Sequence, residues 1–212
     1  CRLPDAFRGL SRSYPVYLET MKIFISTAVS ADGYLDDRSS ERLILSTPED
    51  WAEVHRLRAR SDAILVGAET IRRDDPTLSV HDEALRRERV ARGLPSDPVK
   101  VTLTSSCCLS PDARFFTQGT QEKIVFTSCT EPGPLSRVAT IIPAEKITAA
   151  RIVTELERRG IRSLLVEGGA MTLKMFFEEK LVDTFRLAVN PDIHVNDPLA
   201  PHLEIDPAYR NS

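Results

Sequence analysis

The sequence predicts an α/β protein with a mainly parallel central sheet that is flanked by helices on both faces. Three observations predict this fold class. Short apolar runs rich in β-branched residues alternate with amphipathic helical segments along the chain. The connections between these segments are short, and several apolar runs end directly at a glycine. Hydrophobic residues make up 42% of the 212 residues, which is enough for a substantial core.

The first strand is predicted over 22–29, where the run KIFISTAV stops at the turn signal Ala31-Asp32-Gly33. A helix is predicted from Thr47 to Arg60, because a hydroxyl cap, a proline and two acids precede apolar residues at helical spacing. The charged stretch 81–97 is expected to be a loop. The other predicted strands are 63–66, 99–103, 123–127, 138–142, 163–166 and 184–189, and the other predicted helices are 68–73, 147–159 and 170–179.

Charge and composition exclude several classes of partner. The 28 Lys and Arg residues against 31 Asp and Glu leave a net charge of −3, which argues against nucleic acid and anionic membranes. The longest apolar runs fall far short of the ~20 residues of a membrane helix. Four cysteines without a CxxC pair predict neither a disulfide framework nor a zinc site. We therefore expect a soluble cytoplasmic protein without a metal.

One domain is expected over 21–212. Residues 1–20 lack the apolar centre of a secretion signal and are interpreted as a linker, a tag remnant or an upstream misread start that is not native. Ligands of open α/β sheets bind at the carboxyl ends of the strands. The turns at Asp32-Gly33, Gly67 and Gly168-Gly169 are therefore expected to converge on one crevice.

Two of these turns have the character of a phosphate site. Glu167-Gly168-Gly169 ends a strand and opens a helix, so that backbone N–H groups face outward at the positive end of the helix dipole. A tight turn that needs glycine for its backbone conformation is the alternative, and no G-x-G-x-x-G fingerprint is present. At the Gly67 turn, the Thr70 hydroxyl is placed either to bond a phosphate or to cap the helix.

The segment Asp74-Asp75-Pro76-Thr77-Leu78 places two carboxylates before a proline-fixed turn, and a solvated acidic loop is the alternative. His81 is the histidine nearest a candidate site, whereas His55, His194 and His202 are expected at the surface. Motifs for zinc deaminases, zinc proteases, serine hydrolases and P-loop enzymes are missing from the sequence. This elimination favours redox chemistry with a borrowed cofactor.

Several motifs in order resemble the riboflavin-biosynthesis pyrimidine reductases, which have the dihydrofolate reductase-like fold. The resemblance runs from about Met21 to about Pro198, and the deaminase half of the two-domain relatives is missing from the 212 residues. The matching segments are Ser30-Ala31-Asp32-Gly33, the run from Arg56 to Thr70, Asp74 to Leu78, Leu165 to Ala170 and Leu181-Val182-Asp183.

The resemblance implies reduction by NADPH of the ribosylamino side chain of a pyrimidine 5′-phosphate to a ribitylamino chain, with hydride transfer to C1′ of the sugar. It implies catalytic roles for Asp32 and Glu167. The implied substrate-binding residues are Ser26, Asp75, Leu78 and His81. The implied cofactor-binding residues are Gly67, Thr70, Ser105, Gly168, Gly169 and Ala170.

Some positions depart from the family pattern. Ser26 stands where two-domain relatives commonly have a lysine, and His81 stands where they have an arginine. The neutral residues 106–108 predict weak discrimination between NADPH and NADH. The tail from Leu203 lacks the closing apolar strands of the family, so we expect either an incomplete edge or a homodimer that completes it. Reduction of another pteridine- or pyrimidine-like substrate and a non-catalytic nucleotide-binding role remain alternatives.

Overall fold

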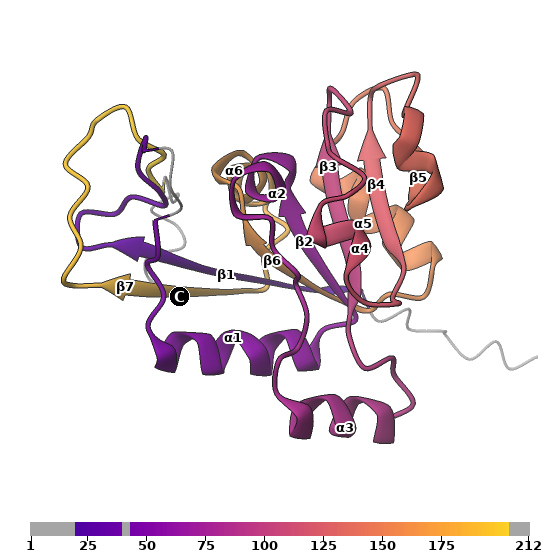
Figure 1. Ribbon diagram of the computed structural model, residues 1–212, viewed down its shortest axis with the longest axis horizontal. Helices are drawn as coiled ribbons and strands as arrows, with labels where there is room; N and C mark the ends of the chain where they lie inside the picture. Colours follow the sequence, from indigo (N-terminus) through magenta and orange to yellow (C-terminus); the bar gives the residue numbers. More distant parts are fainter. Residues whose placement is uncertain (1–19, 40–42, 204–212) are drawn as a thin grey trace, which may run out of the picture.

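The structure is a computed structural model that describes residues 20–39 and 43–203 (Figure 1). Its centre is a seven-stranded sheet with the order β5-β4-β3-β2-β6-β1-β7, and every neighbouring pair of these strands is parallel. All of the predicted strands are confirmed. They are β1 (Lys22–Ser30), β2 (Ala63–Gly67), β3 (Val99–Thr104), β4 (Lys123–Thr127), β5 (Thr140–Pro143), β6 (Ser163–Gly168) and β7 (Thr184–Asn190).

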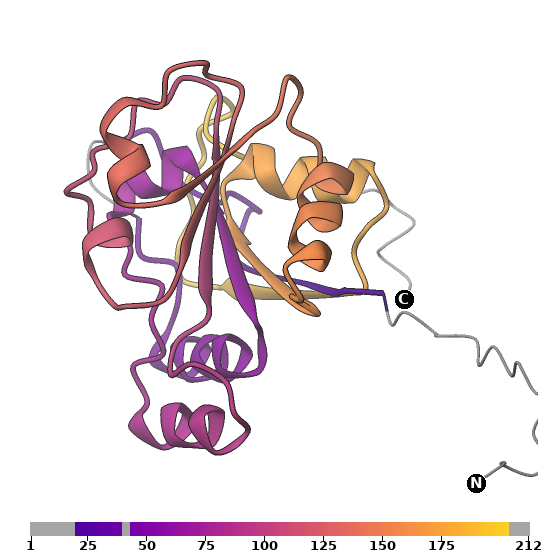
Figure 2. The same cartoon turned by 90° about the vertical axis from the view of Figure 1, so that its right-hand side faces the viewer.

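Helices cover both faces of the sheet, as predicted (Figure 2). One core joins β1, β4 and β6 to the helices α5 and α6 through side chains such as Ile152, Leu156 and Phe176. The second core lies on the opposite face, where Ile71 and Phe115 from α2 and α4 contribute. The helices are α1 (Pro48–Arg60), α2 (Ala68–Asp74), α3 (Glu83–Ala91), α4 (Arg114–Thr117), the 3₁₀ helix η2 (Gly133–Arg137), α5 (Ala149–Arg158) and α6 (Ala170–Glu178).

The helix starts follow from their caps. The Thr47 hydroxyl accepts a hydrogen bond from the amide of Asp50 at 3.2 Å, which fixes the predicted start of α1. The Thr148 hydroxyl accepts one from the amide of Arg151 at 3.1 Å, and α5 therefore begins at Ala149, two residues after the predicted start. The expectations for residues 1–19 and 204–212 concern parts of the chain outside the described residues.

The prediction of a loop over 81–97 was wrong, because this stretch contains α3. The carboxylate of Asp82 caps the helix by accepting hydrogen bonds from the amides of Ala84 and Leu85. Arg89 is only 1% exposed, and its guanidinium donates to the carbonyl oxygens of Pro95 and Ser61. The high density of charged residues over 81–97 suggested that this stretch is exposed to solvent on all sides. One of those charges is instead buried against backbone carbonyls, most of them about 30 positions away in the sequence.

Only the first part of β1 pairs with β6, and the rest of the strand extends beyond it. β1 pairs with β6 only over 22–25, whereas it pairs with β7 from Phe24 to Ser30. The last five residues of β1 extend about 16 Å beyond this pairing at roughly 3.3 Å per residue. Figure 1 shows β1 and β7 running together away from the other strands. The Asp32-Gly33 turn lies at the far end of this extension and does not join the glycine turns of β2 and β6, contrary to the prediction.

Candidate functional site

A cavity of about 1110 Å³ lies at the carboxyl ends of the strands. This volume exceeds the roughly 300–1,000 Å³ of a typical small-molecule site, so two ligands can lie side by side in it. Except for Asp32, all of the predicted site residues line this cavity. They are Ser26, Gly67, Thr70, Asp75, Leu78, His81, Ser105, Glu167, Gly168, Gly169 and Ala170.

Asp32 organises a turn away from the cavity. Its carboxylate accepts hydrogen bonds from the Ser30 hydroxyl at 2.6 Å and from the amides of Val195 and Asn196 at 3.1 and 2.8 Å. Desolvation opposes ionisation of this carboxyl, but these hydrogen bonds outweigh it and lower the pKa of Asp32 to about 2. We therefore do not place Asp32 in the candidate site, because a carboxylate that is ionised at neutral pH and bound to backbone amides has no proton to give.

The two glycine turns form a cradle of bare backbone. A Cβ atom on Gly67 would lie 2.8 Å from the Thr172 hydroxyl, and one on Gly169 would lie 3.3 Å from Cα of Gly67. Gly169 also has φ of +88°, which favours glycine. Gly168 differs, because a Cβ there would meet only the Thr70 hydroxyl at 3.7 Å. Gly67 and Gly169 thus allow the turns to touch, and the space in front of Gly168 is open.

Glu167 lies at a β-bulge beside this cradle. Leu65 pairs with Val166 and Val66 pairs with Gly168, so Glu167 is the extra residue of β6. Both of its carboxylate oxygens are bound by Arg58 of α1, at 2.7 Å from Nε and 2.6 Å from Nη2. Arg58 also donates to the carbonyl of Ser79 at 2.9 Å. This two-pronged ion pair is almost completely buried, with side-chain exposures of 6% and 10%.

One face of α1 forms a wall of the cavity that sequence reasoning missed. Asp50, Trp51, Val54, His55 and Arg58 all line the cavity. The guanidinium of Arg58 lies 5.8 Å from the centre of the Trp51 ring. The sequence does contain a signal for this wall, because the five positions share one face of α1. However, residues that this face contacts, such as Glu167, are far away in the sequence.

Two histidines meet at this wall. The rings of His55 and His81 have their centroids 5.2 Å apart, and the amide of His81 lies 3.4 Å from Nδ1 of His55. Partial burial lowers the pKa of each ring, and the nearby Arg58 charge lowers it further. Both rings are therefore neutral near pH 7 in the free protein. The prediction that His55 lies at the surface was wrong, because this ring is half-buried between Trp51 and His81.

An arginine of the edge strand completes the same half of the cavity. Arg186 of β7 donates from Nη1 to the hydroxyl of Ser26 at 3.2 Å, and its Nη2 forms an ion pair with Asp50. Ser26 and Asp50 are buried, whereas the Arg186 side chain is 28% exposed. A guanidinium thus stands next to Ser26, the position where the sequence comparison expected a lysine.

The segment 74–78 is ordered by its own contacts. Asp75 adopts a left-handed conformation with φ of +40°, and its carboxylate accepts a hydrogen bond from the amide of Arg114 at 2.6 Å. Leu78 also has positive φ and is buried. The alternative of a solvated loop therefore does not describe this segment. The Asp75 carboxylate links α2 to α4 and at the same time lines the cavity.

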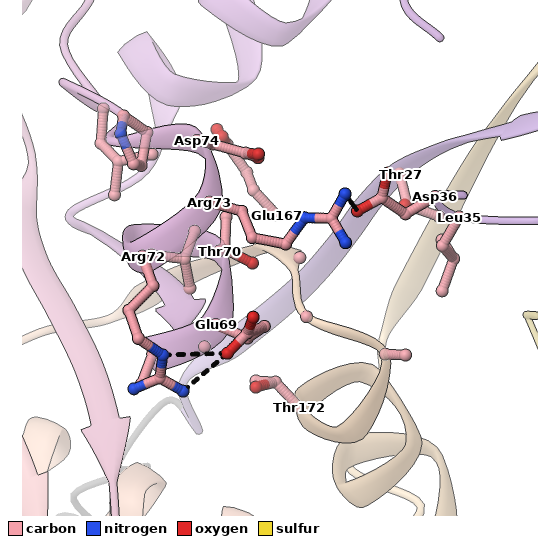
Figure 3. Close-up of a pocket in the computed structure, with 18 of the residues that line it drawn as sticks. Thr27, Leu35, Asp36, Glu69, Thr70, Arg72, Arg73, Asp74, Glu167 and Thr172 are labelled. Carbon is pink, nitrogen blue, oxygen red and sulfur yellow. Dashed lines mark hydrogen bonds and ion pairs between the residues drawn. The ribbon is translucent and has the colours of Figure 1, made fainter. Parts of the chain in front are cut away.

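The other half of the cavity lies toward the ends of β3, β4 and β5. The hydroxyl residues Ser105, Ser106 and Ser128 line it, together with Lys146. Figure 3 shows Arg72 and Arg73 leaving α2 in different directions, with Arg72 bound to Glu69 and Arg73 bound to Asp36.

Lys100 of β3 does not contribute a cation to the cavity. Its side chain is fully buried, and the ammonium donates to the carbonyl oxygens of Phe115 and Gln118 at 2.9 and 2.7 Å. Burial, with a smaller effect of the Lys123 charge, lowers the pKa of Lys100 to about 8. Lys100 therefore anchors the α4 segment and does not face the cavity.

Within residues 20–39 and 43–203, no group of three or more His, Cys, Asp or Glu side chains is arranged to hold a metal ion. In the same part of the chain, no helix has the length and apolar character needed to cross a membrane.

Residues 21–194 match the family described as the RibD C-terminal domain. The chain is 31% identical to a 2,5-diamino-6-ribosylamino-4(3H)-pyrimidinone 5′-phosphate reductase of Archaeoglobus fulgidus, over 80% of each protein. It is 33% identical to the protein of the same name from Aquifex aeolicus, over 83% of this chain and 79% of that relative. It is 29% identical to riboflavin biosynthesis protein RibD of Haemophilus influenzae over 80% of its own length, but it spans only 46% of that protein.

Solved structures share the fold. A deaminase and reductase of Thermotoga maritima, whose title names 5-amino-6-(5-phosphoribosylamino)uracil reductase, has a TM-score of 0.72 at 24% identity and covers 87% of this chain. This chain spans 48% of that protein. The riboflavin biosynthesis reductase Rib7 of yeast has a TM-score of 0.66 at 18% identity, with coverage of 88% of this chain and 79% of the yeast protein. These likenesses show the dihydrofolate reductase-like fold.

Proposed function

Because the chain belongs to the RibD C-terminal domain family, we propose that it uses NADPH to reduce the ribosylamino side chain of a pyrimidine 5′-phosphate to a ribitylamino chain. One observation carries this proposal. A backbone cradle that suits a pyrophosphate and a wall of polar and aromatic side chains face the same cavity, which is large enough for both reactants.

The cradle fits a dinucleotide. Helix α6 starts at Gly169 without a side-chain cap, so its first backbone N–H groups are available to an anion. Gly168 places no side chain in front of these groups, and Thr70 and Ala170 border the same space. We propose that Gly67, Thr70, Gly168, Gly169 and Ala170 hold the pyrophosphate. NADPH and NADH carry the same pyrophosphate, so the cradle accepts either cofactor.

The polar wall suits the substrate. When bound, the nicotinamide would supply a hydride to C1′ of the sugar, while the C1′–O4′ bond of the ribose ring opens and O4′ takes up a proton from water. The protein orients the two reactants. Both oxygens of Glu167 already accept hydrogen bonds from Arg58. We therefore propose that Glu167 positions the substrate rather than donating a proton. Ser26, Asp75 and Leu78 border the same space, and His81 is placed to pair with the phosphate once a proton joins its ring.

The test is direct reduction. Purified protein is mixed with NADPH and either 2,5-diamino-6-ribosylamino-4(3H)-pyrimidinone 5′-phosphate or the corresponding uracil compound. We expect loss of the nicotinamide absorbance and a product mass that is greater by one hydride and one proton. Reduction of a dihydropterin but of neither pyrimidine would assign the other reductase function. Nucleotide binding without turnover of any of these substrates would assign the non-catalytic role.

A further inference from the structure

A charged pair stands at the end of the cavity that lies away from α1. Glu69 and Arg72 are one helical turn apart on α2, and Nε and Nη2 of Arg72 lie 2.9 and 2.8 Å from the same Glu69 oxygen. Both side chains line the cavity, and both are exposed, at 65% for Glu69 and 41% for Arg72. An exposed pair of this kind is held weakly, so a ligand can compete for either partner.

The pair faces the hydroxyl-rich half of the cavity. Nη1 of Arg72 lies 3.4 Å from the carbonyl oxygen of Cys108, in the segment that follows β3. Ser105 and Ser106 of that segment line the same cavity. The neighbouring Arg73 points elsewhere and is bound to Asp36, as Figure 3 shows. Arg72 is thus the guanidinium of α2 that reaches the segment after β3.

We propose that Glu69 and Arg72 recognise the 2′ position of the adenosine ribose and so set the choice between NADPH and NADH. This inference rests on the proposed function: with the pyrophosphate in the cradle and the nicotinamide beside the substrate wall, the adenosine extends into the other half of the cavity, where Ser105 lies. A guanidinium matches the oxygens of a phosphate with two parallel hydrogen bonds, and Arg72 therefore binds the 2′-phosphate of NADPH. A carboxylate accepts a hydrogen bond from the 2′-hydroxyl of NADH, as acidic residues do in other dinucleotide sites, and Glu69 provides that acceptor.

This inference reverses one expectation from the sequence. The neutral residues 106–108 predicted weak discrimination between the two cofactors. Arg72 lies 36 positions before Cys108, and only the fold brings its guanidinium to that segment. Lys146, which follows β5, and Arg114, at the start of α4, also line the cavity, and Lys146 serves as the matched comparison.

The test uses 2′,5′-ADP and 5′-ADP as probes in calorimetric titrations, so that no turnover is needed. Arg72→Ala should weaken 2′,5′-ADP binding by about 30-fold, the loss expected for charge-assisted hydrogen bonds to a phosphate, and should leave 5′-ADP binding unchanged. Glu69→Gln should strengthen 2′,5′-ADP binding several-fold, because Arg72 loses its competing partner, and should weaken NADH binding. Lys146→Ala should leave the ratio of the two affinities unchanged.

An equal loss for both probes in Arg72→Ala, or a ratio that depends on Lys146 instead, would overturn the assignment. Circular dichroism of each variant excludes unfolding as the cause. Failure of the proposed function is recognised separately. If the wild-type protein binds 2′,5′-ADP through Arg72 but reduces neither pyrimidine, the cofactor assignment stands and the substrate proposal fails.

Discussion

Two parts of the cavity, the cradle and the wall, are built in different ways. The cradle at β2 and β6 consists of backbone, and its key positions are glycines that let the two turns touch. The wall at α1 and β7 consists of side chains whose charges are matched in pairs, Arg58 with Glu167 and Arg186 with Asp50. The cradle offers bare backbone, whereas the wall offers a specific arrangement of charge and aromatic surface. Under the proposed function, we therefore expect the wall to determine the choice of substrate.

The difference also concerns the distance along the chain. Each turn of the cradle is local, because it is made by a few consecutive residues, although the two turns come from different strands. The wall is not local, since Arg58 and Glu167 are 109 positions apart and Arg186 and Ser26 are 160 apart. A substitution in the wall should consequently disturb folding as well as function. In the cradle, a substitution of Gly168 should weaken ligand binding without disturbing folding.

The largest expected effect is on stability. Arg58→Ala leaves the buried Glu167 carboxylate without its partner, and we expect the free energy of unfolding to fall by about 3–5 kcal/mol. Urea denaturation followed by circular dichroism measures this loss. Arg56→Ala on the same helix is the control, because its pair with Glu53 is exposed and should contribute less than about 1 kcal/mol. Equal losses in the two variants would mean that the wall is not held by its buried ion pair.

The cradle should give the next effect, on cofactor affinity. Gly168→Val fills the open space before the helix, and we expect NADPH binding to weaken by about 100-fold, or roughly 2.7 kcal/mol, without unfolding. Gly169→Ala instead forces a side chain into a left-handed conformation, which should cost about 1–2 kcal/mol of stability. Titration calorimetry and thermal denaturation measure both quantities. Full cofactor affinity in a folded Gly168→Val protein would show that the pyrophosphate does not bind in the cradle.

The smallest expected effect is the pH dependence of the wall. The pKa of His55 and that of His81 are lowered in the folded state, so the unfolded chain binds more protons below about pH 6.5. The free energy of unfolding should therefore decrease as the pH falls below that value. Because His81 is exposed, we expect less than about 1 kcal/mol in total. The His55→Gln/His81→Gln protein should lose this dependence in urea denaturation between pH 5 and pH 7, and an unchanged slope would contradict the assignment.

The parts that sequence reasoning predicted are those that local chemistry determines. Apolar runs gave all the strands, and the glycine turns at Gly67 and Gly168 were predicted to meet in one cavity, as the structure shows. Asp32 was misplaced because sequence does not reveal how far β1 extends past its neighbour. Arg58 was missed because a charged residue on a helix is usually exposed, and nothing in its neighbourhood identifies Glu167 as the partner that buries it.

The bulge in β6 shifts the register of the residues that follow it relative to the residues that precede it. Before the bulge, the alternation of Leu164, Leu165 and Val166 is fixed by the two cores that they fill. The single extra residue, Glu167, then shifts the chain by one position, so that Gly168 pairs with Val66. Deleting Glu167 would therefore pull Gly169 out of contact with Gly67 and bring Ala170 into the turn. A deletion at this position would alter the cradle and the wall at once, whereas a substitution of Glu167 would leave the backbone register unchanged.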